Sequence, residues 1–224
     1  MRFAVELKGQ ADTLANVAPC FQGDIARIVI RDDRWFLESS AFDGCTNGGQ
    51  VFPIADNILG LIHRICYLYT RLLAPFTIGY VQPLNETGAP LGRVLRASDT
   101  VNVYSSRGIE ELRDSRGSQT LGTETLTRAL EDQEVRVALA LIGENDVEWP
   151  RIYDIVEFLG PETIVENKWA TRKTVRRLRQ TANHYRHLGR PQNNRLPPDP
   201  PSLQESISLV LDLLKKWMSR TQMR

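Results

Sequence analysis

The first hundred residues show an alternation of apolar and polar positions that predicts a β-sheet. Phe3, Val5 and Leu7 occupy every second position, with Arg2, Glu6 and Lys8 among the residues between and beside them, as in a strand that has one buried face. Residues 25–38 contain two apolar runs separated by four charged residues, a pattern typical of a β-hairpin. Further strands, bounded by turns rich in Gly, Pro and Asn, are predicted at residues 76–81, 93–95 and 101–104.

One long helix is predicted within the same half of the chain. Residues 54–73 place apolar side chains at i, i+3, i+4 and i+7, as in an amphipathic helix that packs on a sheet. Residues 43–50 precede it and are rich in Gly and Asn, which favours a loop. We therefore expect the N-terminal half to be a mixed sheet with one long helix.

The period of the apolar residues becomes helical in the second half of the chain. Residues 149–159 follow the helical spacing closely, and Pro150 suits a first helical turn. Ser202 and Glu205 have the spacing of a capping box, which predicts the start of another helix. Four helices are predicted in all, at residues 123–142, 149–159, 168–188 and 203–218. Four helices with short connections favour a small up-and-down bundle.

A polar segment separates these two halves. Residues 105–122 contain Gly108, Gly117 and Gly122 and show no apolar period, as expected of a linker. The predicted fold class is therefore α+β, and three parts are expected: an α/β domain over residues 1–106, a linker over 107–122 and a helical domain over 123–224.

Composition narrows the class of protein further. Cys20, Cys45 and Cys66 are far apart and have no zinc-type spacing, so we expect neither a disulfide framework nor a metal site. Charged residues interrupt the longest apolar stretch, residues 54–76, so we expect no membrane span. The N-terminus is charged and strand-like rather than a signal peptide, which favours a cytoplasmic location. The sequence contains no glycine-rich phosphate loop, so we expect no cofactor.

The net charge is only +1, but charges are sorted along the second half. Residues 144–166 hold seven acids and one arginine, whereas residues 168–195 contain no Asp or Glu. One interpretation is a bundle in which an acidic helix packs beside a basic helix, with solvated outer faces. The other is a surface that binds a polyanion through phosphate contacts. The candidate nucleic-acid-binding residues are Arg172, Lys173, Arg176, Arg177, Arg186 and Arg190.

Two of the three histidines lie in the same basic helix. Arg179, Asn183 and His187 follow each other at i, i+4 offsets and share a face, and His184 lies on a neighbouring face. An imidazole exchanges protons near neutral pH, and a guanidinium can hold a phosphate and stabilise growing negative charge. With RNA the 2′-hydroxyl supplies the nucleophile, so such a site needs no metal. The alternatives are a helix-terminal role for His187, which would complement the helix dipole, and a plain surface role for His184.

These residues resemble the motif of the HEPN domain, the higher eukaryote and prokaryote nucleotide-binding helical family. That motif is an Arg, often followed by Asn, with a His a few residues later. Four residues separate Arg179 from His184 here. Alternatively, Asn183 and His187 match the Asn-x-x-x-His part, and Ala182 then stands in the place of the arginine. The resemblance covers about residues 123–224 and not the N-terminal half.

The resemblance implies a helical domain that is often homodimeric and is a metal-independent ribonuclease in many members, including antiviral ones. It makes Arg179, Asn183, His184 and His187 the candidate catalytic residues. Three functions stay open: an RNA-binding protein or ribonuclease, a catalytically silent HEPN-like subunit that binds a protein partner or assembles a complex, and an unrelated two-domain protein whose basic helix pairs with a protein partner.

Overall fold

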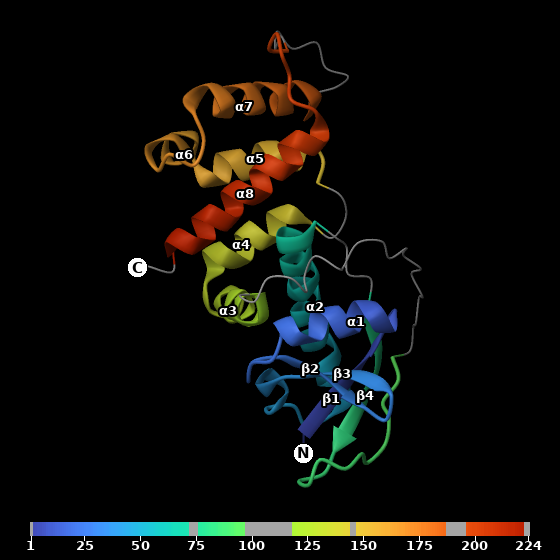
Figure 1. The fold of residues 1–224 in the computed structure, drawn as a ribbon. Coiled ribbons are helices and arrows are strands. Elements are labelled where there is room, and N and C mark those ends of the chain that lie inside the picture. Colours follow the sequence, from blue (N-terminus) through green and yellow to red (C-terminus); the bar gives the residue numbers. More distant parts are fainter. Residues whose placement is uncertain (1, 72–75, 97–117, 144–146, 187–195, 222–224) are drawn as a thin grey trace. The chain divides into compact units, whose positions relative to one another are not determined.

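The structure, a computed structural model, has two compact units that are described separately below. The units comprise residues 1–131 and 132–224. The described parts of the chain form an α+β fold with a four-stranded antiparallel sheet and eight α-helices (Figure 1). These parts are residues 2–71, 76–96, 118–143, 147–186 and 196–221.

The N-terminal unit contains the sheet, and its strands are β1 (Arg2–Lys8), β2 (Arg27–Arg31), β3 (Arg34–Glu38) and β4 (Thr77–Leu84). The first predicted strand and the hairpin are thereby confirmed. Asp32 and Asp33 both have positive φ in the two-residue turn between β2 and β3, a conformation typical of a tight hairpin. The predicted strand at 93–95 is wrong, because Val94 makes only an isolated bridge with Val81. Residues 101–104 lie outside the described residues.

The connectivity of this unit places one helix after β1 and one after β3. These are α1 (Ala11–Val17) and α2 (Gly48–Thr70), and short 3-10 helices occur at Ala18–Cys20 and Ser40–Phe42. The strand order in the sheet is β2-β3-β1-β4, and every pair is antiparallel. This β-α-β-β-α-β order is the split β-α-β connectivity of ferredoxin-like folds, which host many unrelated functions.

Helix α2 begins earlier than the sequence predicted. The side chain of Asn47 accepts a hydrogen bond from the backbone N–H of Gln50 at 3.2 Å and caps the helix, so part of the predicted loop at 43–50 is helical. Among the described residues, α2 is the one helix with the length and mean hydropathy of a membrane span. In the structure 61% of that span is buried within the protein, as in the core helix of a folded domain.

Helix α3 (Ser118–Glu131) belongs to this same unit. The backbone N–H of Gln22 donates to Thr123 Oγ1 at 3.1 Å, and Thr123 Oγ1 donates to the carbonyl of Cys20 at 3.2 Å. A Cβ atom at Gly122 would lie 2.5 Å from that carbonyl oxygen, so this close approach needs glycine. Residues 107–117 of the predicted linker lie outside the described residues, and residues 118–122 form the start of α3.

The structure has two helices where one helix was predicted at residues 123–142. The prediction was wrong because the helix is interrupted at one residue. Asp132 has extended backbone angles, and its carboxylate accepts hydrogen bonds from the N–H groups of Glu134 and Val135 at 2.8 and 3.4 Å. It therefore ends α3 and caps α4 (Gln133–Ile142). The boundary between the two units falls at this cap.

The described residues of the C-terminal unit form helices and the segments that join them, and they contain no strand. Helix α5 (Trp149–Leu159) packs against α4, α7 (Arg172–Arg186) and α8 (Leu203–Thr221) (Figure 1). The predicted capping box is confirmed, because Glu205 accepts from the N–H of Ser202 at 2.7 Å and donates its own N–H to Ser202 Oγ at 3.2 Å. Helix α6 (Pro161–Glu166) was not predicted. The side chains at the centre of the core are Ile152, Ile155, Val156, Leu178, Ala182, Leu211 and Leu214.

Candidate functional site

Helix α7 carries most of the residues that the sequence analysis selected. The hydroxyl of Thr171 accepts the N–H of Thr174 at 3.1 Å and stabilises the start of the helix. Val175, Leu178 and Ala182 are buried at helical spacing, which fixes the inner face of α7 against α5. The arginines between these positions are therefore directed outward, in two groups with different surroundings.

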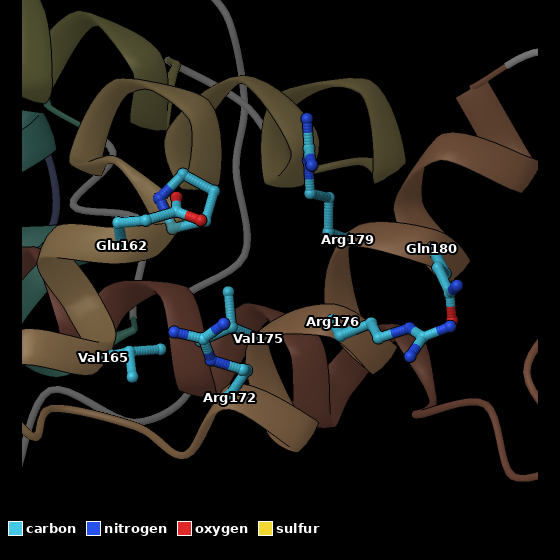
Figure 2. A pocket seen from close by; sticks show the side chains of 8 residues that line it. Glu162, Val165, Arg172, Val175, Arg176, Arg179 and Gln180 are labelled. Carbon is cyan, nitrogen blue, oxygen red and sulfur yellow. The ribbon is translucent and has the colours of Figure 1, made fainter.

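The first group, Arg172, Lys173 and Arg176, is exposed. Among the described residues none of these three makes an ion pair. Arg172 and Arg176 border a pocket of about 330 Å³ between α6 and α7 (Figure 2). Glu162 is the one acid among the residues that line this pocket. Two uncompensated guanidiniums one turn apart beside a pocket can bind a phosphate-bearing ligand.

The second group begins at Arg177 and is engaged by other side chains. Arg177 Nη1 pairs with Asp199 Oδ2 at 2.6 Å. Arg179 forms a two-point contact with Glu157 of α5, in which Nη2 donates to Oε2 at 3.2 Å and Nε donates to Oε1. Hydrogen bonding to Glu157 raises the pKa of the Arg179 guanidinium. Figure 2 shows Arg179 turned away from Arg172 and Arg176, although it also lines the pocket.

Aromatic rings hold the end of α7 to α5. The guanidinium of Arg186 lies 3.6 Å from the ring centre of Tyr153, and that of Arg179 lies 5.8 Å from the same ring centre. Tyr185 stacks on Trp149 with ring centres 4.9 Å apart and planes 19° apart. The ring of His184 meets Tyr185 edge-on at 5.2 Å. These contacts are of the kind that fix a helix end to its neighbour.

Only some of the candidate catalytic residues belong to the described part of the chain. Arg179 is committed to Glu157, and Asn183 and His184 are half-buried at the following turn. His187 and Arg190 lie outside the described residues. Ala182, which takes the place of the signature arginine in the alternative match, is fully buried in the core. A long charged side chain would not fit there without displacing its neighbours.

Sequence reasoning missed the residues of α5 and α6 that shape this site, namely Trp149, Tyr153, Glu157 and Glu162. The excess of acids in residues 144–166 was the one signal, and it indicated an acidic helix beside a basic one without giving the pairs. The Arg179–Glu157 contact agrees with that interpretation for the second group of arginines.

The chain matches no protein-family model, no curated protein and no solved structure.

Proposed function

We propose that α7 binds the sugar-phosphate backbone of RNA through Arg172, Lys173 and Arg176. One observation carries the proposal: these three exposed cations lack ion pairs among the described residues, and Arg172 and Arg176 border a pocket of about 330 Å³. A cation without a protein partner can neutralise an RNA phosphate, and the release of the counterions condensed on the RNA adds affinity. The resemblance of residues 179–187 to the HEPN motif supports RNA as the polyanion.

The dependence of affinity on salt tests the proposal directly. Wild-type protein is titrated with a fluorescent single-stranded RNA at several salt concentrations, and anisotropy gives the dissociation constant. Replacing Arg172 and Arg176 with Ala should weaken binding and lower the slope of log K against log salt by about 0.7 for each lost phosphate contact.

Arg151→Ala is the matched control. Arg151 is an exposed arginine on α5, and it forms no ion pair with any described residue. Its loss lowers the net charge by one without touching the pocket, so the slope should stay close to that of wild type. Equal slopes in the double variant and in Arg151→Ala would refute a binding surface on α7.

The contact between Arg179 and Glu157 favours binding without cleavage over ribonuclease activity. An arginine held by a carboxylate is a poor stabiliser of negative charge on a reacting phosphate, because its own charge is compensated. Incubation of RNA with the protein in EDTA separates the two functions. If wild type cuts RNA and His184→Ala abolishes cutting while affinity is kept, the ribonuclease function replaces binding alone.

The homodimer implied by the HEPN resemblance stays a prediction. Light scattering at micromolar concentration, with and without RNA, measures the mass of the assembly. A single-subunit mass in both conditions would remove the dimer from the proposal and leave RNA binding by α7 intact.

A further inference from the structure

One face of the sheet in the N-terminal unit carries arginines around a small apolar cluster. Ala4, Phe36, Tyr80 and Leu84 form this cluster, and Val29 packs against it. The rings of Phe36 and Tyr80 meet edge-on, with their centres 6.2 Å apart. The cluster provides a rigid floor, since its four central side chains are almost completely buried.

A cavity of about 240 Å³ lies on this face. Three of the residues that line it are arginines: Arg31 at the end of β2, Arg34 at the start of β3 and Arg93 from the segment after β4. Asp32 is the one acid in its lining. The lining residues carry a net charge of +2, although Arg31 and Arg34 also face Glu38 and Glu6 outside the lining.

The ion pairs of these arginines leave some of their N–H donors without an acceptor. Arg31 pairs with Glu38, but the same carboxylate also holds Arg27 at 2.6 Å. The second terminal nitrogen of Arg31, Nη1, is buried and has no hydrogen-bond partner among the described residues. Burial and the neighbouring Arg27 lower the pKa of Arg31, as expected of a guanidinium whose charge is incompletely compensated. A buried donor without an acceptor is costly, and that cost falls if the guanidinium turns toward an anion in the cavity.

The other two arginines are held in place by Tyr80. Arg34 Nη1 donates to the hydroxyl of Tyr80 at 3.2 Å and lies 3.9 Å from Glu6. The guanidinium of Arg93 lies over the ring of Tyr80, 4.8 Å from its centre, and it makes no ion pair with the described residues. Tyr80 thus fixes two cations at one side of the cavity before any ligand binds, which lowers the entropy cost of binding.

We propose that this cavity binds the phosphate group of a phosphate monoester, held by Arg31, Arg34 and Arg93. Guanidiniums match the oxygen geometry of phosphate. The volume of about 240 Å³ is below the usual size of sites that enclose whole cofactors, so the cavity fits a phosphate and little beyond its first attached group. The phosphate can come from a free nucleoside monophosphate or from the 5′-phosphorylated end of an RNA chain.

Calorimetric titration of the full chain with AMP, and with short RNA oligomers that carry a 5′-phosphate or a 5′-hydroxyl, tests the proposal and identifies the source. We expect saturable one-to-one binding of AMP or of the 5′-phosphorylated oligomer. Tighter binding of AMP identifies a free nucleotide, and tighter binding of the phosphorylated oligomer than of its 5′-hydroxyl form identifies an RNA end. Absence of saturable binding of AMP, together with equal affinity for the two oligomers, overturns the site.

Arg93→Gln is the decisive variant, because Arg93 is exposed and its loss is compatible with folding. We expect its affinity for the phosphate ligand to fall about ten-fold, as for the loss of one charge-assisted hydrogen bond. Arg96→Gln is the matched control: its guanidinium also lies 4.8 Å from a ring centre, that of Phe52, but it does not line the cavity. Equal affinities of the two variants overturn the site.

The proposed function on α7 is tested separately by the same titration. Replacing Arg172 and Arg176 with Ala should leave AMP binding unchanged, because neither residue lines the cavity on the sheet. If that double variant loses the phosphate ligand while Arg93→Gln retains it, the ligand binds on α7, and the cavity on the sheet is not its site.

Discussion

The two halves of α7 both carry basic side chains, but these side chains have different neighbours. In the first half, Arg172, Lys173 and Arg176 face outward without ion pairs among the described residues. In the second half, Arg179 is held by Glu157, and Arg186 lies on Tyr153. The comparison teaches that a run of basic residues does not measure the capacity to bind an anion. That capacity depends on how many of the charges the rest of the fold has already compensated.

Charge reversal in the first half should give the largest effect. Replacing Arg172 and Arg176 with Glu is expected to reduce RNA affinity by about 100-fold, roughly ten-fold for each lost charge-assisted contact. The free energy of unfolding, measured with urea, should change by less than about 0.5 kcal/mol, because both side chains are exposed. A large loss of stability with unchanged RNA affinity would show that the RNA-binding residues lie outside the first half of α7.

Removal of the Tyr153 ring, which contacts the second half of α7, should destabilise the protein instead. Tyr153→Ala removes the contacts with Arg179 and Arg186, and we expect a loss of about 2 kcal/mol in urea unfolding. Tyr153→Phe keeps the ring and should remain close to wild type. RNA affinity should change little in either variant, and a ten-fold loss in Tyr153→Ala would show that the second half also binds RNA.

Release of Arg179 from its carboxylate partner should have a smaller effect. Glu157→Gln leaves Arg179 uncompensated, so RNA affinity should rise about three-fold, a change of roughly 0.6 kcal/mol. Stability should fall by less than about 1 kcal/mol, because this ion pair is solvent-exposed. Anisotropy titration measures the RNA affinity, and urea unfolding of the same preparation measures the stability. An unchanged affinity would mean that Arg179 is too far from the bound RNA to contribute.

The smallest effect is expected at Arg177. Its partner Asp199 has a side chain that is 86% exposed, so the pair is a surface contact screened by salt. Arg177→Gln should change the free energy of unfolding by less than about 0.5 kcal/mol. Thermal unfolding at low and high salt is the measurement, and a loss above about 1 kcal/mol would show that this pair holds the segment around Asp199 to α7.

Local patterns predicted most of the secondary structure and few of the contacts that define the site. The pattern of Phe3, Val5 and Leu7 and the capping box at Ser202 are signals that lie within a few residues, and the structure confirms the strand and the helix start. The strand is buried on both faces rather than on one, because Ala4 is also fully buried. The break at Asp132 was missed because apolar positions on its two sides keep a helical period. The extended backbone of Asp132, whose carboxylate accepts hydrogen bonds from the N–H groups of Glu134 and Val135, separates the two helices.

The ion pairs of α7 could not be predicted in the same way. Arg179 and Glu157, and likewise Arg177 and Asp199, are 22 residues apart in sequence. No helical or strand period relates residues at that separation, and the packing of α7 on α5 and the return of the chain toward α8 decide which acid meets which base. The sequence therefore predicts a basic helix here but not its division into paired and unpaired arginines.

The arginines at the ends of β2 have a further consequence for solubility. β2 lies at one edge of the sheet, and Ile30 within it is 57% exposed. An edge strand with exposed apolar residues is prone to pair with a strand of another molecule. Arg27 and Arg31, both held by Glu38, place positive charge at the two ends of this strand and make such pairing between identical copies repulsive. We therefore expect variants that lack either arginine to aggregate during refolding.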